Sequence, residues 1–263
     1  MKLPSLNTRS VDSKDNQGTP VKLISLRSVG VGSLVGFCTF PATLGTLQIV
    51  LFSPLRLSCS IPVVSSVSGT LAVATSVTVA SIASISASLF YQRLENSLAT
   101  KKDTRKEISL RYSFSPVDLG FYTVAAGITF KIAGGRFKSV LPSSFFKAGA
   151  FAHSCIPAKG QMYATKKEKW LLTSLGRKYG CHTCGSRRSK FYFGDHIPPN
   201  TLLRKGEQQV FYPQCNQCSS LQGGLLSGNK SNFKLKTHAL SLRLYHLYLP
   251  FPFILMAIRQ FAI

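Results

Sequence analysis

Four cysteines toward the C-terminal end stand in two pairs, and each pair has two residues between its members. They are Cys181 with Cys184 and Cys215 with Cys218. This spacing lets both thiolates of a pair bind one metal ion from a tight turn, so two pairs can complete a tetrahedral site. Four thiolates around one ion are typical of structural zinc. The sequence therefore predicts a structural zinc site, in a compartment that keeps thiols reduced.

An acidic residue and a histidine, Asp195 and His196, lie between the two pairs. They follow a short aromatic run at residues 189–193 and precede the prolines at 198–199. A neutral imidazole can take a proton from water, and a carboxylate offers a hard oxygen ligand to a cation such as Mg²⁺. The alternative is a strand-end pair that stabilises the metal-binding fold. We expect His182, inside the first cysteine pair, to be a solvated turn residue.

The order Cys-x-x-Cys, Asp-His, Cys-x-x-Cys resembles the HNH, or His-Me finger, endonucleases with a treble-clef zinc knuckle. The resemblance covers about residues 177–224. It implies a small ββα fold, His196 as general base, Asp195 as a ligand of a catalytic Mg²⁺ or Mn²⁺, and a separate structural zinc on the cysteines. That family commonly has Asn or His just after the last zinc cysteine, as a further ligand of the catalytic metal. This chain has Ser219 there, and a hydroxyl is a weaker ligand, so a non-catalytic module stays open.

The chain is strongly basic, with a net charge of +23 over 263 residues and no acidic residue after Glu207. This imbalance indicates an anionic partner such as DNA, RNA or acidic lipid headgroups. The alternative is the basic flanking of membrane helices. The candidate nucleic-acid contacts are the cations near the cysteine motif: Arg187, Arg188, Lys190, Arg204 and Lys205. We find no glycine-rich phosphate loop, so no nucleotide cofactor is expected.

Two long segments without charged residues, Val29–Leu55 and Ile61–Tyr91, fill much of the first third of the chain. A membrane-spanning helix needs about 20 predominantly apolar residues, and both segments are longer. The short connection Arg56–Ser60 predicts a helical hairpin in a lipid bilayer; buried core helices or strands are the alternative. Basic residues flank both outer ends of the hairpin. The positive-inside rule then places these ends, and the zinc module with them, on the cytosolic side or its nuclear or matrix equivalent.

The sequence thus predicts a mainly α membrane protein with a small α+β treble-clef zinc module near the C-terminus. The expected segments are a disordered basic N-terminus at 1–28, a transmembrane hairpin at 29–91, a polar linker or helix at 92–116, a second membrane or interfacial hairpin at 117–158, the zinc module at 159–228 and a basic, apolar tail at 229–263. Three functions remain open: a membrane-anchored metal-dependent nuclease, a non-catalytic zinc module that binds protein, nucleic acid or lipid headgroups, and a membrane scaffold.

Overall fold

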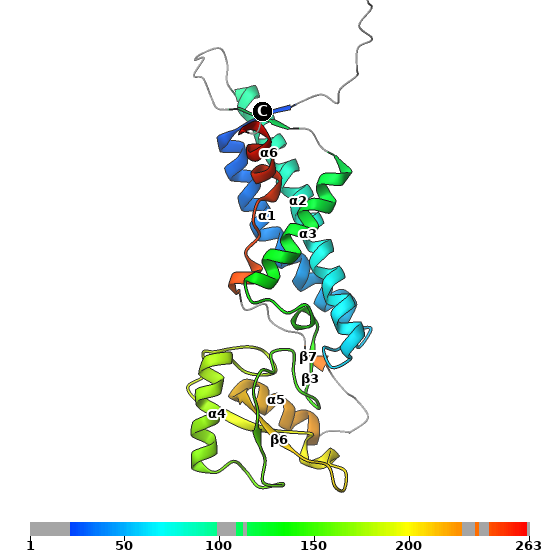
Figure 1. Ribbon diagram of the computed structural model, residues 1–263, viewed down its shortest axis with the longest axis vertical. Helices are drawn as coiled ribbons and strands as arrows, with labels where there is room; N and C mark the ends of the chain where they lie inside the picture. Colours follow the sequence, from blue (N-terminus) through cyan, green and yellow to red (C-terminus); the bar gives the residue numbers. More distant parts are fainter. Residues whose placement is uncertain (1–21, 99–108, 113–114, 228–234, 237–241, 262–263) are drawn as a thin grey trace, which may run out of the picture.

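The computed structural model describes residues 22–98, 109–112, 115–227, 235–236 and 242–261. It consists of a helical bundle and a smaller module below it (Figure 1). The helices are α1 (Leu26–Leu47), α2 (Pro62–Leu98), α3 (Pro116–Ile132), α4 (Lys166–Tyr179), α5 (Asn216–Ser227) and α6 (Phe251–Phe261). The strands are β1 (Lys22–Ser25), β2 (Ser109–Tyr112), β3 (Ser143–Ser144), β4 (Ile156–Pro157), β5 (Tyr192–Ile197), β6 (Val210–Cys215) and β7 (Leu235–Lys236).

The antiparallel pair α1 and α2 forms the core of the bundle. A π-helical turn, Gln48–Phe52, continues α1 to the connection with α2. Both helices are long and apolar enough to cross a membrane, as the uncharged runs predicted. Small residues permit their close approach: a Cβ on Gly32 would lie 2.5 Å from the backbone oxygen of Ser84. The Ser84 hydroxyl donates to the Gly32 carbonyl at 2.7 Å, which fixes the two helices to each other.

The sequence predicted a disordered N-terminus at residues 1–28. Of this segment, residues 1–21 lie outside the described residues. Residues 22–28 form β1 and the start of α1. Strand β1 pairs antiparallel with β2, so the segment that precedes α1 meets the segment that follows α2. Part of the predicted linker at 92–116 and part of the tail at 229–263 also lie outside the described residues.

Helix α3 covers the apolar run that begins at Val117, and it packs against α2. The hairpin predicted at 117–158 includes a second apolar run, Val140–Ala152, which is not helical beyond its first residue. This run contains β3, turns and extended chain. The reason is tertiary: the backbone N–H of Cys59 donates to the Pro142 carbonyl, and Gln48 donates to the Val140 carbonyl. The run is held as an irregular wedge under the α1–α2 connection.

The tail returns along the bundle, and its last helix, α6, has 11 residues. At about 1.5 Å per residue this helix is too short to cross a bilayer by itself. It packs beside α3, where Arg259 binds both carboxylate oxygens of the buried Asp118, at 2.7 and 3.3 Å. The tail therefore completes the bundle as a packed element.

The module is built on an antiparallel sheet of order β4-β6-β5, with α4 and α5 packed against it. Thr165 and Glu168 form a capping box that starts α4, because each side chain bonds the other's backbone. Strand β5 begins at Tyr192, later than the predicted aromatic strand, and it extends to Ile197. Asp195 and His196 therefore lie within the strand rather than after it.

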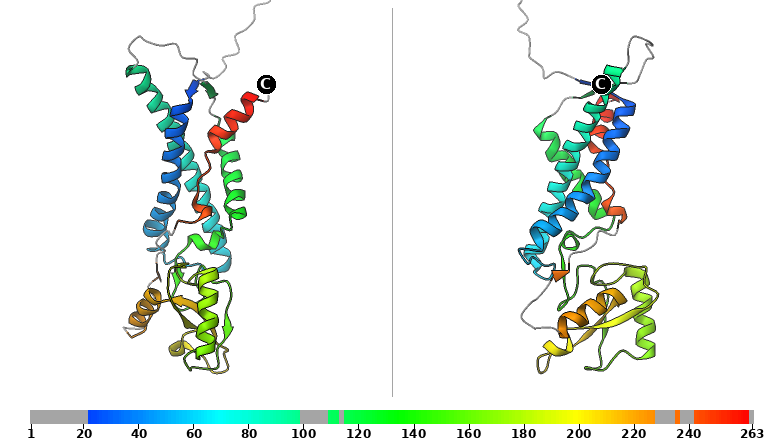
Figure 2. Two further views of the ribbon diagram at one scale, coloured as in Figure 1. Left: turned by 90° about the vertical axis from the view of Figure 1, so that its left-hand side faces the viewer. Right: turned by 180° about the vertical axis from the view of Figure 1, so that it is seen from behind.

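The module lies beside the α1–α2 connection, at the opposite end of the bundle from the start of α1 (Figures 1 and 2). This differs from the sequence-based expectation, which put the module with the outer ends of the hairpin. The difference arises because α3 leads the chain back along α2 before the module begins. Backbone contacts between Cys59 and Pro142 and between Phe151 and His182 join the connection, the wedge and the module.

Candidate metal centre

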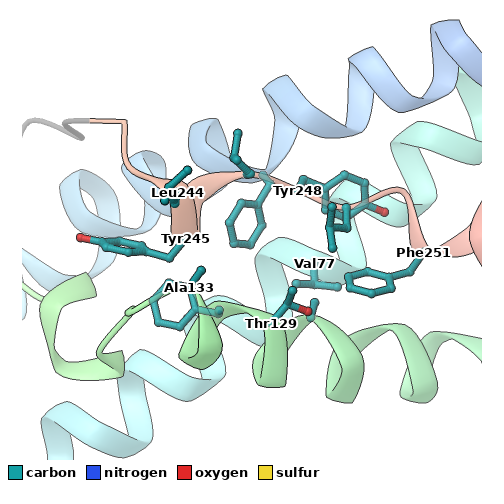
Figure 3. Close-up of a pocket in the computed structure, with 12 residues that line it drawn as sticks. Val77, Thr129, Ala133, Leu244, Tyr245, Tyr248 and Phe251 are labelled. Atoms are coloured by element: carbon teal, nitrogen blue, oxygen red, sulfur yellow. The ribbon is translucent and has the colours of Figure 1, made fainter.

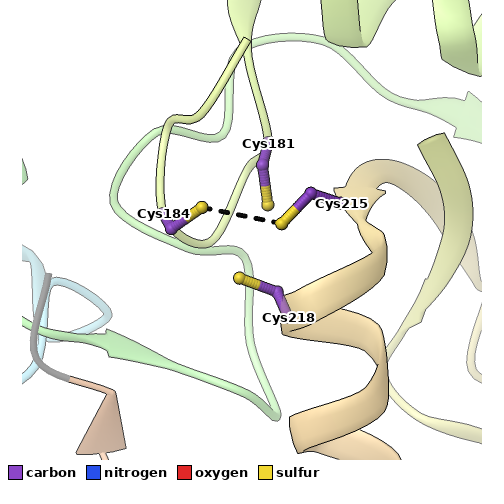
Figure 4. A group of neighbouring side chains, drawn as sticks. All are labelled: Cys181, Cys184, Cys215 and Cys218. Carbon is purple, nitrogen blue, oxygen red and sulfur yellow. Dashed lines mark hydrogen bonds between the residues drawn. The ribbon is translucent and has the colours of Figure 1, made fainter. Parts of the chain in front are cut away.

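The four paired cysteines meet at one point between the turn that follows α4 and the start of α5 (Figure 4). Their sulfur atoms all lie within 4.8 Å of one another, and the Cys184 and Cys215 sulfurs are 3.7 Å apart. Four sulfurs at about 2.3 Å from a tetrahedral zinc ion would be roughly 3.8 Å apart. The cluster is thus compatible with zinc and could hold a metal ion.

Local backbone geometry brings the first pair together. Gly180, with φ of 92°, caps the C-terminal end of α4, and the following turn closes at Gly185, with φ of 74°. These are left-handed values that favour glycine. The Gly185 N–H donates to the Cys181 carbonyl at 2.7 Å, and the Cys181 N–H donates to the Ser186 carbonyl. The turn therefore presents the sulfurs of Cys181 and Cys184 on one side.

The second pair comes from the junction of β6 and α5. Cys215 is the last residue of β6, and Cys218 lies in the first turn of α5. The N-terminal end of a helix carries a partial positive charge, which stabilises nearby thiolates. The junction thus gives the second pair both its spacing and a favourable electrostatic environment.

The sulfurs differ in how readily they lose a proton. Burial is the largest effect on Cys181 and raises its pKa. Hydrogen bonds from the neighbouring thiols lower the pKa of Cys184, and a hydrogen bond with Cys181 is the largest of the effects that lower the pKa of Cys215 to about 6. Packing thiols this closely therefore favours anionic sulfur in part of the cluster, which suits a bound cation.

Asp195 is buried beside the cluster and binds other side chains of the module with both carboxylate oxygens. Oδ2 lies 2.8 Å from Nε2 of His182 and accepts from the amide of Gln214 at 3.3 Å. Oδ1 accepts from the amide of Gln222 at 2.9 Å. The two glutamines also bond each other, at 2.6 Å. Asp195 is therefore the centre of a buried network, and its oxygens face protein donors.

His182 is not the solvated turn residue we expected, because its side chain is 1% exposed. Its Nδ1 accepts a hydrogen bond from the Gly149 N–H at 3.1 Å. Nδ1 is thus unprotonated and the proton lies on Nε2, which donates to Asp195. The sequence did not predict this network. Its members His182, Gln214 and Gln222 come together only through the register of the sheet and the packing of α5.

The network reaches out of the module to the wedge. Gln222 donates to the Phe145 carbonyl at 2.9 Å, and Ser143 donates to the Thr183 carbonyl at 2.6 Å. A Cβ on Gly149 would lie 2.3 Å from the His182 carbonyl oxygen, so only glycine fits there. The cysteine turn is therefore docked against the chain that leads from the bundle.

His196 faces away from Asp195, because successive residues of a strand point to opposite faces of the sheet. Asp195 faces α5. His196 lies on the α4 side, where its ring centroid is 4.5 Å from that of Phe211. Phe211 in turn packs with Leu172 of α4. Nε2 of His196 lies 3.2 Å from the carbonyl of Met162, which can only accept, so Nε2 donates. The structure does not bring the Asp-His pair onto one surface.

Among the described residues, the four cysteines are the only group of three or more His, Cys, Asp or Glu side chains placed to hold a metal ion. Ser219, the predicted further ligand, is half-buried in the first turn of α5 next to Cys218. The predicted nucleic-acid contacts are all exposed on the module: Arg187, Arg188, Lys190, Arg204 and Lys205. Among the described residues the geometry thus gives one candidate metal centre and a separate basic surface.

Comparisons of the chain with protein-family models, with curated proteins and with solved structures found no match. The resemblance to the HNH endonucleases therefore depends on the motif residues and their spacing alone. What the structure itself contributes is a four-cysteine cluster that could hold a metal, in a chain with two helices apolar enough to cross a membrane.

Proposed function

We propose that this protein is a membrane-anchored, zinc-stabilised module that binds nucleic acid without cleaving it. The observation that carries this proposal is the position of Asp195. Both of its oxygens accept hydrogen bonds from buried neighbours, while His196 faces the other side of the sheet. A nuclease of the HNH type would need both side chains at one open, metal-binding surface.

The bundle supports the anchor. Helices α1 and α2 each exceed the length that a bilayer requires. Large apolar side chains are exposed on the outer faces of three helices, including Leu34, Val63, Phe90, Val124 and Ile132. A water-soluble protein rarely exposes so many on continuous surfaces. In a bilayer, lipid chains would cover these faces, so their apolar area would not be exposed to water.

Zinc is the metal that fits best. Tetrahedral coordination by four thiolates is typical of zinc, and iron is the other metal that such ligands select. A redox-inactive ion in a closed four-cysteine site has no open position for substrate, so its role is to stabilise the fold. Metal analysis of the purified protein separates zinc from iron.

The thiolates also support a location for the module in a reducing compartment, as in the cytosol, nucleus or mitochondrial matrix. The module lies by the α1–α2 connection, so that connection would be on the same side. The start of α1 would then be on the opposite side of the bilayer. This orientation keeps the module, but not the outer ends of the hairpin, on the side that the sequence predicted.

The surface of the module supports nucleic acid as its partner. Residues 159–227 contain 11 basic and three acidic residues, and Asp195, one of the three, is buried. Trp170 and Phe191 are exposed, at 70% and 69%. Exposed aromatic rings among cations can stack on unpaired bases while the cations neutralise phosphates.

The test uses the full chain in detergent micelles and a fluorescent single-stranded oligonucleotide. We expect zinc near one equivalent, binding that weakens steeply with salt, and no cleavage with Mg²⁺ or Mn²⁺. Replacing Arg188 and Lys190 by glutamine should reduce the salt dependence by roughly two charges. The control is Lys159→Gln, at an exposed position away from the cysteine turn. It measures how much the loss of any one positive charge weakens oligonucleotide binding.

Two results would overturn the proposal. Absence of oligonucleotide binding by zinc-loaded protein would exclude the nucleic-acid partner. Cleavage that requires a divalent cation and is lost in His196→Ala would instead establish the nuclease. The variant must retain its zinc for this comparison, because a module that has lost its metal would be inactive for another reason.

A further inference from the structure

The bundle contains an apolar cavity of about 200 Å³ between α3 and the returning tail (Figure 3). Its walls come from α1, α2, α3 and the segment 244–251, and include Phe40, Val77, Phe130, Tyr248 and Leu249. The polar groups in this lining are already used: Tyr248 shares a hydrogen bond with Ser81, and Thr129 bonds its own helix. The interior therefore offers mainly apolar surface to an occupant.

One wall residue, Tyr245, connects the cavity with a group of cations. Figure 3 shows its hydroxyl directed away from the other lining side chains. Burial, the largest influence, raises the pKa of Tyr245, whereas the positive charges of Arg243, Arg187 and Arg136 lower it. Contacts place these arginines in one region: Arg243 donates to the carbonyl of Gly185, two residues before Arg187, and covers the ring of Phe151. Arg136 donates to the carbonyl of Ala152, the residue that follows Phe151.

Two of the three arginines are fixed in place by backbone carbonyls, and one of these two also by an aromatic ring. Arg243 donates to the Gly185 carbonyl and lies 4.9 Å above the ring of Phe151. Arg136 donates to the Ala152 carbonyl at 2.9 Å. A guanidinium has five N–H donors, so each of these groups keeps donors for a further acceptor. Arg187 is exposed.

No carboxylate of the described residues pairs with these arginines. Asp118 pairs with Arg259 and Glu95 with Arg27 at the far end of the bundle. Glu168 caps α4, Asp195 is within the buried network, and the Glu207 side chain accepts from the Arg204 N–H. The cluster thus has positive charge that an anion could neutralise.

We propose that this cavity and the arginine cluster together bind one anionic phospholipid, with an acyl chain in the cavity and the phosphate at Arg136, Arg187 and Arg243. This rests on the bilayer insertion in the proposed function. The apolar cavity lies inside the helical bundle, and the cations lie where the bundle meets the module. An amphiphile with one charged end and one hydrocarbon end matches that order. Arginine forks suit phosphate oxygens in particular.

The test is native mass spectrometry of the full chain, titrated with dioleoyl phosphatidylglycerol or dioleoyl phosphatidylcholine. We expect the anionic lipid to bind about tenfold more tightly, as one additional charged hydrogen-bonded contact predicts. Arg187→Gln should abolish most of this preference, whereas Lys159→Gln should preserve it. Ala133→Phe, which fills the cavity, should weaken both lipids. Val124→Phe adds similar bulk on the exposed face of α3 and should weaken neither.

Three results would overturn the inference. Equal affinity for the two lipids would exclude a headgroup site, and a preference that survives both Arg187→Gln and Ala133→Phe would place the site elsewhere. Binding of glycerol phosphate as tight as that of the whole lipid would show that the cavity adds nothing, and would assign the arginines to a free anion. Liposome flotation separates this failure from a failure of the proposed anchor: protein that floats without lipid preference loses only the inference.

Discussion

The bundle and the module satisfy their buried polar groups in different ways. In α1 and α2 many hydroxyl groups bond a carbonyl four residues earlier in the same helix, as Ser33, Thr39 and Ser76 do. In the module the buried polar groups bond across elements: His182, Asp195 and Gln222 come from a turn, a strand and a helix. Polar satisfaction is mostly local in α1 and α2, with a few bonds between helices such as that from Ser84 to Gly32, and it is tertiary in the module.

This difference is compatible with the proposed insertion of the bundle in a bilayer. A helix that satisfies its own polar groups needs no water and no partner, which is the requirement for a segment in lipid. A network that spans several elements is formed only when all of them are in place, so it is sensitive to any one loss. The module gains a second long-range tie from its four-cysteine cluster. The stability of the module should therefore depend more on long-range links than that of the bundle does.

The largest expected effect is that of Cys218→Ser, which removes one of the four sulfurs that could hold a metal ion. Structural zinc contributes on the order of 10 kcal/mol to folding in small zinc modules, so the module should unfold. The bundle should retain its helices, because α1 and α2 have no ligand in the cluster. Metal analysis and limited proteolysis check this, with Cys38→Ser, at an exposed position in α1, as the control. Simultaneous collapse of the bundle would show that the regions are not separate.

Gly69→Ala should break the bundle and spare the module. A Cβ at this position of α2 would lie 2.1 Å from the backbone oxygen of Phe137. Backbone atoms cannot move aside as the end of a flexible side chain can. We therefore expect the free energy of unfolding to fall by about 3 kcal/mol. Thermal unfolding in micelles should show a lower Tm with zinc retained. Gly127→Ala is the matched control, since nothing lies within 4 Å of a Cβ there.

Asp195→Asn is expected to weaken the module with its metal still bound. The asparagine keeps the shape but directs an N–H either at the Nε2–H of His182 or at the amides of the glutamines. One buried donor is then unsatisfied, at a cost of about 2 kcal/mol. Hydrogen exchange of β5 and β6 should speed up while zinc content stays constant. Loss of zinc from this variant would mean that the network and the cluster form one unit.

Arg27→Ala should have the smallest effect. The Arg27 and Glu95 side chains are 3.7 Å apart, and that of Arg27 is 73% exposed. Exposed pairs of this kind contribute about 0–1 kcal/mol. Melting in micelles should therefore hardly change. A Tm drop as large as that of Gly69→Ala would show that polar ties matter as much in the bundle as in the module.

The sequence by itself determined the local features of this protein. Cysteines two residues apart meet in one turn because short-range backbone geometry dictates it, and uncharged runs of sufficient length form helices for the same reason. The glycines at 180 and 185 likewise mark the turn that they close. Each of these features depends on residues that are neighbours in the chain.

Only the tertiary structure decided the direction of Asp195, the burial of His182 and the place of the module. Whether Asp195 faces α5 or α4 depends on strand register, since a shift of one residue exchanges the faces. Adjacent residues 195 and 196 thus belong to different environments, although their spacing suggested one catalytic pair. The module lies by the α1–α2 connection because α3 packs back along α2, a contact between segments about 45 residues apart. The spacing of residues in the chain determines which side chains meet in one turn. Long-range packing determines what those side chains contact.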